Sequence, residues 1–470
     1  MTKLQKMSIF AQLNTTKMRR FTTLILSLLL GVTAFAQSPE AVLESIRKQP
    51  NLAVTVGATY PTTVSKIATA PKGFEPFYLS MVGRHGSRYE QNGKNEKVAL
   101  AIYRKADSLG ILTEAGKRAY AKIAESNKIQ NGHYGELTPL GYEQWRNIGQ
   151  RAHKNFGAIF EGGTVEAKAS IRMRCVLSMV AFNQGLKECN PKIGICQDSR
   201  ESDLPIIRPL YDNPDVPASA KAIHHNYRNT GAWLKAREEW ERSRNCDAFL
   251  SKITTDKERL LTECGAKYPL RIARYTYRTL IFTENFEVDN RELVNLLFTP
   301  EELYDIYVYS TAQWMNNAVG RGNEVVEMFA SYMLPMVDDI LDKANEAVEG
   351  KNPYCANLRF THDTYVTPLL SVIGYEGCVP QWSEDIEKAT TSFNHGEKVP
   401  MASNLQIVLY RNKKGEILVR SLINERDAYL PIECKTAPFY PWNDFCNHIT
   451  KSMEELIKTR KKLLKEFSKE

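Results

Sequence analysis

Three times along this 470-residue chain, a short apolar or alternating run ends in a cluster of polar residues that a helical pattern follows. The runs are Phe77–Val82, Thr164–Ser170 and Ala356–Phe360. Runs of this length and pattern are typical of β-strands. The repeated order of strand, polar cluster and helix predicts an α/β fold, in which reactive groups gather at the carboxyl ends of the strands.

The first polar cluster is Arg84-His85-Gly86-Ser87-Arg88. Two guanidinium groups can hold a tetrahedral dianion, and a neutral imidazole between them can attack its phosphorus atom. The same residue types also occur in ordinary solvated loops. The motif therefore predicts phosphoryl transfer only if the chain supplies a further arginine and a proton donor elsewhere.

The other two clusters supply these groups. Arg172-Met173-Arg174-Cys175 follows the second strand at the start of a helix, where a guanidinium is well placed for an anion. Thr361-His362-Asp363-Thr364 follows the third strand; its imidazole can hydrogen-bond a phosphoryl oxygen and its carboxyl can protonate a leaving alkoxide. Taken singly, they are equally compatible with surface arginines and with an aspartate that caps a helix.

A nucleophile, a cationic clamp and an acid together suffice for hydrolysis of a phosphate monoester without a metal or other cofactor. We therefore expect no cofactor. No Cys or His spacing resembles a zinc site, and the adjacent His224 and His225 point their side chains in different directions on regular secondary structure.

With these motifs in this order, the chain resembles the histidine acid phosphatases, the second branch of the histidine phosphatase superfamily. Further matching stretches are Leu137–Gly141, Arg174–Val176, Ala181–Gly185 and Met401–Leu405. The resemblance covers about residues 74–435. It implies a three-layer, phosphoglycerate-mutase-like α/β domain with a mainly α-helical inserted second domain, and a substrate cleft between them.

The resemblance also implies a role for each matching residue. His85 would be the nucleophile that becomes phosphorylated, and Asp363 would protonate the leaving group and then help to activate water. The phosphate pocket would be lined by four residues: Arg84, Arg88, Arg174 and His362. Arg172 has no family counterpart and is left out of the site. Lys94 is either a ligand of a second substrate phosphate or an exposed loop lysine.

Within the family, the amino-acid sequence around the motifs is most similar to that of the multiple inositol polyphosphate phosphatases. Those usually carry His-Ala-Glu at the third site, whereas this chain has His-Asp-Thr, as in phytases and broad acid phosphatases. We therefore expect an inositol polyphosphate (phytate) phosphatase. A broad-specificity acid phosphatase or a sugar-phosphate phosphatase remains the alternative.

The pattern along the chain divides it into five parts. We expect a signal peptide at 1–36, an N-terminal extension at 37–73 with a helix over Pro39–Lys48, and the first part of the α/β domain at 74–200. Charged helical runs, among them 232–246 and 253–264, mark an α-helical insertion at 201–350. The α/β domain resumes at 351–470 with a hairpin, Leu405–Tyr410 and Ile417–Ile423, and a final helix over Met453–Phe467.

The N-terminal segment predicts export. Lys17–Arg20 is basic, Phe21–Val32 is apolar but short for a membrane span, and Ala34-Phe35-Ala36 fits a cleavage site. An uncleaved anchor is the alternative. Five positive charges of the formal +8 lie within residues 1–20, so the remainder gives little reason to expect a nucleic-acid partner. We expect a periplasmic or secreted protein with a small phosphomonoester as its partner and no membrane span after cleavage.

The cysteines and three other enzyme classes also bear on the function. The nine cysteines are an odd number, and Cys189 and Cys196 flank a short loop as a plausible disulfide pair.

A nucleotide-binding P-loop is excluded because Gly86 and Gly93-Lys94 do not have the spacing that this motif requires. A serine hydrolase is excluded by the absence of a G-x-S-x-G motif. Export argues against a mutase-type transferase. A non-catalytic phosphate-ester-binding protein needs neither His85 nor Asp363 and is the second alternative.

Overall fold

The centre of the protein is a mixed β-sheet. The computed structural model describes residues 38–63, 66–230, 232–265, 267–318, 321–380, 383 and 385–468. Within them, the strands follow the order β3-β2-β4-β1-β5-β6-β7, and β8 pairs with β6. The strands β1 to β4 run parallel, and β5 to β8 are antiparallel to their neighbours. Their bounds are Glu75–Arg84 (β1), Thr164–Ala169 (β2), Gly194–Asp198 (β3), Ala356–Thr361 (β4), Asn404–Arg411 (β5), Ile417–Ile423 (β6), Arg426–Ala428 (β7) and Tyr440–Pro441 (β8).

The strand β1 lies in the middle of the sheet, between β4 and β5, and is buried on both faces. Side chains alternate along a strand, so Leu79 and Met81 enter one hydrophobic core while Tyr78 and Val82 enter the other. Burial on both faces explains why its sequence is a continuous apolar run. The carboxyl end of β1 therefore emerges at the centre of the molecule.

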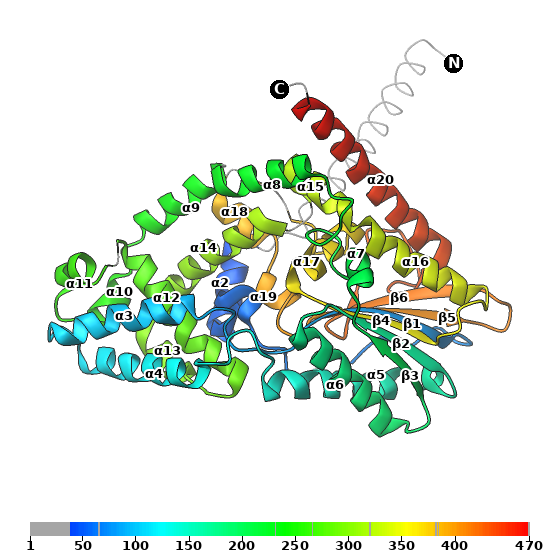
Figure 1. Ribbon diagram of the computed structural model, residues 1–470, viewed down its shortest axis with the longest axis horizontal. Helices are drawn as coiled ribbons and strands as arrows, with labels where there is room; N and C mark the ends of the chain where they lie inside the picture. The colour runs from blue at the N-terminus through cyan, green and yellow to red at the C-terminus, as the bar shows by residue number, and fades with distance from the viewer. Residues whose placement is uncertain are drawn as a thin grey trace, which may run out of the picture.

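Helices cover both faces of the sheet and give three layers (Figure 1). On one face lie α5 (Pro139–Phe160) and α6 (Met173–Cys189), which pack against β1, β2 and β4. On the other face lie α16 (Leu334–Val348), α17 (Asp363–Ile373) and α20 (Trp442–Phe467). This arrangement confirms the predicted three-layer α/β fold.

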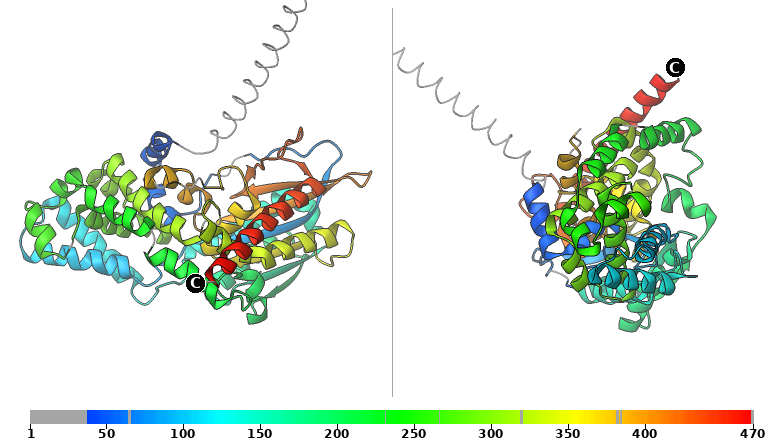
Figure 2. Two further views of the ribbon diagram at one scale, coloured as in Figure 1. Left: turned by 90° about the horizontal axis from the view of Figure 1, so that it is seen from above. Right: turned by 90° about the vertical axis from the view of Figure 1, so that its left-hand side faces the viewer.

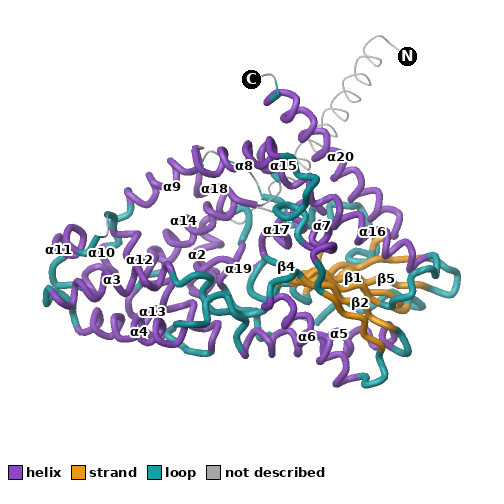
Figure 3. Tube along the Cα trace, viewed as in Figure 1, coloured by secondary structure: helices purple, strands orange, loops and turns teal. Residues whose placement is uncertain are grey.

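A mainly helical part adjoins the sheet at the carboxyl ends of β1 and β4 (Figure 3). Its principal helices are α3 (Lys94–Ser108), α4 (Glu114–Gln130), α8 (Ala218–Thr230), α9 (Ala232–Ser243), α10 (Asp247–Ile253), α11 (Lys257–Glu263), α12 (Pro269–Phe282), α13 (Arg291–Leu297), α14 (Pro300–Ala318) and α15 (Glu324–Ala330). The helices α3 and α4 come from outside 201–350 but pack on α12, whereas α16 lies within that range and packs on β1. The domain boundaries remain a prediction.

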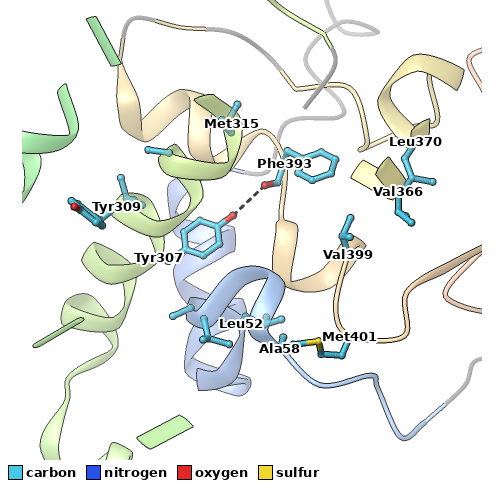
Figure 4. Packing of buried hydrophobic residues seen from close by; sticks show 14 of the residues in the cluster. Leu52, Ala58, Tyr307, Tyr309, Met315, Val366, Leu370, Phe393, Val399 and Met401 are labelled. Carbon is cyan, nitrogen blue, oxygen red and sulfur yellow. Dashed lines mark hydrogen bonds between the residues drawn. The ribbon is translucent and has the colours of Figure 1, made fainter. Parts of the chain in front are cut away.

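The segment before the first strand belongs to the core of this helical part. It forms α2 (Pro39–Lys48) and the 3₁₀ helix η1 (Pro50–Gly57), which packs against α14, α12 and the short helix α19 (His395–Lys398). Figure 4 shows Leu52 and Ala58 in the same cluster as Val399 and Met401, with Tyr307 of α14 donating to the Phe393 carbonyl. At its end, the Ala58 carbonyl accepts from the Met401 amide at 2.8 Å, so that this segment reaches the chain just before β5.

Most predicted elements occur where the sequence placed them. The helix α2 has the predicted bounds, and the strand β4 runs one residue beyond the predicted Phe360. Thr138 caps α5 by accepting from the Gly141 amide, with Pro139 in the first turn. The capping box at Thr299 and Glu302 is formed by two reciprocal hydrogen bonds of 3.0 and 3.2 Å. The hairpin of β5 and β6 is also confirmed.

Three predictions were wrong in detail. The run 253–264 is two helices, since α10 ends at Ile253 and α11 begins only after Asp256, whose side chain caps it. The last helix begins at Trp442 rather than Met453, because an aromatic first half buries itself against the sheet before the charged half begins. Cys189 and Cys196 are both exposed free thiols, so the expected pair is not formed.

The C-terminal half of α20 extends away from the body of the molecule (Figures 1 and 2). Of the helices the structure describes, none combines the length and the apolar character that a bilayer crossing needs. The predicted signal peptide, residues 1–36, lies outside the described residues.

Candidate active site

The three polar clusters meet at the carboxyl ends of β1, β2 and β4. The strand β4 pairs in parallel with both of the others, and Arg84 lies opposite Thr361 in the register. The His85 amide donates to the Thr361 carbonyl at 3.1 Å, and the Ser170 amide donates to the Phe360 carbonyl at 2.9 Å. Segments far apart in sequence are thus joined by main-chain hydrogen bonds.

His85 is held in one tautomer. Its Nδ1 lies 2.9 Å from the Gly86 carbonyl oxygen, which only accepts, so Nδ1 carries the proton and Nε2 keeps its lone pair. The side chain is buried, and this burial together with Arg84, Arg174 and Arg88 holds the pKa of His85 well below its usual value. The imidazole is therefore neutral and its Nε2 is a free nucleophile at acid and neutral pH.

Arg84 is fully buried and is fixed by the main chain. Its Nη1 donates to the carbonyl oxygens of Val56 at 2.6 Å and Val399 at 2.9 Å, and its Nη2 lies 3.3 Å from Asp363 Oδ2. Burial lowers the pKa of Arg84 while Asp363 raises it. The segment η1, outside the sheet, thereby helps to orient the first guanidinium of the clamp.

Arg88 and Arg174 present further positive charge. Arg88 donates from Nη1 to the Tyr89 carbonyl at 2.8 Å, and burial lowers its pKa to about 10, so that it stays protonated at neutral pH. Arg174 reaches the Gly135 carbonyl at 3.5 Å and His362 Nδ1 at 3.4 Å. The Nε atoms of Arg84, Arg88 and Arg174 are buried and have no hydrogen-bond partner among the described residues.

His362 lies beside His85, with ring centroids 5.5 Å apart in an edge-to-face arrangement. Its Nδ1 accepts from Arg174 and its Nε2 lies 3.3 Å from Ser170 Oγ, which assigns the proton to Nε2. Burial and Arg174 lower the pKa of His362 to about 3. The ring is neutral, and it can donate a hydrogen bond to an anion only when its proton moves to Nδ1, the nitrogen that faces Arg174 in the empty site.

Asp363 begins α17 directly after the strand β4. Burial raises the pKa of its carboxyl, but Arg84, Arg88 and His362 outweigh that effect and hold it below the usual value. The carboxyl also accepts from the Thr364 amide at 3.1 Å. Asp363 is thus ionised while it faces the arginines alone, and a dianion bound between them would raise its pKa by opposing their charge.

The glycine of the first cluster is required by close packing. A Cβ at Gly86 would lie 2.2 Å from the Gly141 carbonyl oxygen, and a Cβ at Gly141 would lie 2.1 Å from the Ser87 carbonyl oxygen. Trp145 of α5 donates from its ring nitrogen to the Arg84 carbonyl at 3.0 Å. The start of α5 is therefore pressed against residues 84–87 and fixes the loop that carries His85.

Two cavities meet at the site. One, of about 700 Å³, is lined by His85, Arg88, Arg174, His362 and Asp363, and also by Arg172 and Arg208. The other, of about 490 Å³, shares Arg88 and Asp363 and extends along the helical part, where the exposed Lys94 lies at its edge. Five of the six predicted site residues thus line the cleft, and the sixth, Arg84, lies buried behind it against Asp363. Both doubtful residues, Arg172 and Lys94, line the cleft as well.

Arg208 was missed by the sequence analysis. It follows the short helix α7 (Leu204–Ile207), where its Nε lies 2.7 Å from Asp212 Oδ2 and donates to the Tyr365 hydroxyl at 3.3 Å. No motif surrounds it, and only the fold brings it to His362. Cys175 also contacts His362, but burial raises the pKa of its thiol to about 12, so it is not a competing nucleophile.

Within the described part of the chain, no group of three or more His, Cys, Asp or Glu residues is arranged to hold a metal ion. The arrangement at the strand ends brings a neutral imidazole with a free lone pair, the guanidinium groups of Arg88 and Arg174 and one carboxyl group into a single cavity, with the buried Arg84 directly behind the carboxyl group. Such a set can bind a tetrahedral dianion, attack it and protonate a leaving group.

The sequence profile of the histidine phosphatase superfamily (branch 2) matches residues 78–424. A search of curated protein sequences gave no significant match. Among solved structures, a multiple inositol polyphosphate phosphatase from Bifidobacterium longum, in complex with inositol hexasulfate, is similar with a TM-score of 0.65 and 19% identity, over 84% of this chain and 97% of that one. The phytase from D. castellii is similar with a TM-score of 0.61 and 19% identity, over 86% of each chain. The phytase from Klebsiella sp. ASR1 has a TM-score of 0.51 and 13% identity, over 82% and 97%. At these identities the likeness concerns the fold.

Proposed function

The chain belongs to branch 2 of the histidine phosphatase superfamily, and from this premise we propose that it is a phosphomonoesterase that acts on inositol polyphosphates through a phosphohistidine at His85. One observation carries the proposal most directly. The Nδ1–H···O=C bond from His85 to Gly86 leaves Nε2 unprotonated inside a cavity lined by Arg88 and Arg174.

In the first step, the phosphate group binds between Arg84, Arg88 and Arg174. Arg174 turns from His362 to the phosphate, and the His362 ring, with its proton now on Nδ1, donates to a phosphoryl oxygen. The Nε2 lone pair of His85 forms a bond to phosphorus, and the phosphorus–oxygen ester bond breaks. The departing oxygen takes a proton from Asp363 and leaves as an alcohol. The guanidinium groups offset the charge on the equatorial oxygens in the transition state.

In the second step, a water molecule replaces the alcohol. The carboxylate of Asp363 accepts a proton from this water as its oxygen bonds to phosphorus, and the phosphorus–nitrogen bond breaks. Inorganic phosphate leaves and takes this proton from Asp363, so that His85 and Asp363 return to the forms they have in the empty site. Asp363 must therefore be protonated before the first step, although Arg84 and Arg88 hold its pKa low in the empty site.

The substrate supplies the proton that Asp363 needs. A phosphate monoester has a second pKa near 6, so below about pH 6 it arrives as a monoanion. Binding between three arginines favours the dianion, and the proton can pass to Asp363. The proposed enzyme therefore works best under acid conditions.

An inositol polyphosphate fits the cleft better than a small monoester does. The two cavities together are larger than a substrate with a single phosphate needs, and cationic side chains line both of them. The solved relative from B. longum was captured with inositol hexasulfate, which resembles phytate in charge and shape. A broad-specificity acid phosphatase remains the alternative, because the His-Asp-Thr sequence at residues 362–364 is shared with such enzymes.

The proposal includes export. The basic and apolar segments of residues 1–36 support a signal peptide, which would deliver the chain to the periplasm or the medium. N-terminal sequencing of the secreted product tests this, with Gln37 as the expected first residue.

The decisive assay measures release of inorganic phosphate from phytate, an aryl phosphate and glucose phosphates between pH 3 and 8, with and without a chelator. Hydrolysis of phytate with the highest kcat/KM, unaffected by chelator, is the expected result. Equal kcat/KM for all substrates would favour the broad-specificity alternative. Tight binding of phytate without turnover would indicate the non-catalytic protein.

A further inference from the structure

A second cluster of arginines lies on the helical wall of the 490 Å³ cavity. Arg237 extends from α9 and Arg274 from α12, and both line this cavity together with Tyr309 of α14. The guanidinium of Arg237 lies 4.5 Å from the centre of the Tyr309 ring, and that of Arg274 lies 4.7 Å from the same ring. Arg274 also lies 4.4 Å from the Tyr275 ring.

These two arginines differ from most others in the described part of the chain because neither forms an ion pair there. Their neighbour Arg278, one turn further along α12, is paired with Glu90 at 2.9 Å. The Nε atoms of Arg237 and Arg274 are buried and have no hydrogen-bond partner among the described residues. Partly buried cations are normally paired with an acid, so two unpaired ones on one ring form a site suited to an anion.

The cavity has the charge that this requires. Among its lining residues, five are cationic and only two are carboxylates, Glu90 and Asp363. Glu90 is already paired with Arg278, and Asp363 lies 3.3 Å from Arg84. Among the described residues that line this cavity, no carboxylate is therefore left unpaired to neutralise Arg237 and Arg274.

The shared ring also keeps the two groups close together. Both guanidiniums lie near the Tyr309 ring, at 4.5 and 4.7 Å from its centre. A guanidinium that contacts an aromatic ring still has N–H groups free to form paired hydrogen bonds to phosphate oxygens. The cavity they line continues to Asp363, where the scissile phosphate is expected.

We propose that Arg237 and Arg274, positioned by Tyr309, form a distal anion subsite that binds a second phosphate of the substrate across the cleft from His85. This inference rests on the proposed phosphomonoesterase function and adds to it the residues that select polyphosphorylated substrates. A monoester with one phosphate reaches only the strand-end site. A ring that carries several phosphates reaches both.

The test replaces both arginines by methionine, which keeps an unbranched side chain over Tyr309 but removes the charge. The full chain with Arg237→Met and Arg274→Met is compared with the unchanged chain on phytate and on p-nitrophenyl phosphate. The ratio of the two kcat/KM values is expected to fall by about tenfold or more, mainly through the KM for phytate, because charge-assisted hydrogen bonds are lost. Replacing both by lysine should restore part of the ratio.

Arg242→Met is the matched control, since Arg242 lies on α9 as well but is exposed and does not line the cavity. It should leave the ratio unchanged. An unchanged ratio in the double methionine variant overturns the subsite. So does an equal loss on both substrates, which would mean a structural role.

Inhibition by inositol hexasulfate separates this inference from the proposed substrate. The inhibition constant against p-nitrophenyl phosphate hydrolysis is measured for both proteins and needs no turnover of phytate. A rise of about tenfold in the double variant supports the subsite even if phytate proves a poor substrate. An equal constant for both proteins, or no inhibition of the unchanged chain, overturns it.

Discussion

The two walls of the cleft hold their charged groups in different ways. On the sheet wall, Arg84 and His85 are almost fully buried and are bonded to main-chain carbonyls of Val56, Val399 and Gly86. On the helical wall, Arg237 and Arg274 are half-buried and rest on aromatic rings. The sheet wall holds the reacting side chains in fixed positions, as formation of a bond to phosphorus requires. The helical wall can adjust to the shape of a substrate.

This difference assigns chemistry to one wall and selection to the other. Changes on the sheet wall should lower the turnover of every substrate, and changes on the helical wall should alter the preference among substrates. The predictions below test this division, beginning with the largest expected effect.

Replacing the nucleophile should abolish turnover. His85→Ala removes the imidazole that forms the bond to phosphorus, so kcat/KM should fall by at least about 10⁴-fold on phytate and aryl phosphate alike. Phosphate release under single-turnover conditions measures this. His133→Ala, an exposed histidine paired with Glu136, is the control. A substantial residual rate in His85→Ala would place the nucleophile elsewhere.

Replacing the acid should affect poor leaving groups most. Asp363→Asn cannot donate a proton, so kcat/KM for an alkyl phosphate, which reports the phosphorylation step, should fall by about 10²- to 10⁴-fold. It should fall much less for a nitrophenyl ester, whose leaving group needs no proton. The slope of log kcat/KM against leaving-group pKa should become steeper. Equal losses across the series would contradict the acid role.

The pH profile follows from the same residue. In the unchanged chain, kcat/KM should decline above about pH 6, where the substrate no longer brings the proton that Asp363 takes up. In Asp363→Asn this decline should disappear for nitrophenyl phosphate. Persistence of the decline in the variant would assign it to another group.

A substitution in the close packing behind His85 should lower stability and activity by a smaller amount. Gly86→Ala would place a Cβ 2.2 Å from the Gly141 carbonyl oxygen, and the backbone would have to shift. We expect a loss of about 1–3 kcal/mol in the free energy of unfolding and a lower kcat on all substrates, because His85 moves with the loop. Gly157→Ala in α5, where the nearest atom would be 3.9 Å away, is the control. Matching thermal and kinetic behaviour of the two variants would refute the packing argument.

The smallest expected effect concerns stability in acid. His395 is buried behind the helical wall, its ring 6.4 Å from that of Trp314, and burial lowers its pKa to about 3. The unfolded chain binds a proton near pH 6.5 and the folded chain does not, so this histidine costs stability as the pH falls from about 6.5 towards 3.

Each such histidine should lower the free energy of unfolding by about 1.4 kcal/mol per pH unit within that window. His362, with its pKa also lowered to about 3, contributes in the same way from the sheet wall. Denaturant unfolding at pH 7 and pH 5 measures the slope. His395→Phe should reduce the slope, whatever it does to stability at pH 7, and an unchanged slope would show that His395 does not titrate on unfolding.

The same contrast explains what the sequence could predict. The residues Arg84, His85 and Asp363 lie at the carboxyl ends of two predicted strands, and the strand periodicity is enough to place them at the same end of the sheet. Val56, the main-chain partner of Arg84, could not be found this way, because it belongs to a segment whose sequence resembles an irregular extension. Its contact with Arg84 depends on the packing of η1 against α14 and α19.

The helical wall was beyond sequence reasoning for a related reason. Arg237 lies on the charged helix α9 and Arg274 on the more apolar helix α12, and no motif marks either position. Nothing local distinguishes them from Arg242. Only the crossing of α9, α12 and α14 brings their side chains to one tyrosine, and such crossings depend on long-range packing rather than on local pattern.

A phosphoenzyme trapped on the sheet wall tests the central claim most directly. In Asp363→Asn, a nitrophenyl phosphate can still phosphorylate His85, but the water that should remove the phosphate has lost its base, so the intermediate should accumulate. Rapid quenching in alkali, followed by peptide mass spectrometry, should find a phosphoryl group on His85 that is stable in alkali and lost in acid. A phosphoryl group on any other residue, or burst kinetics with none at all, would contradict the account.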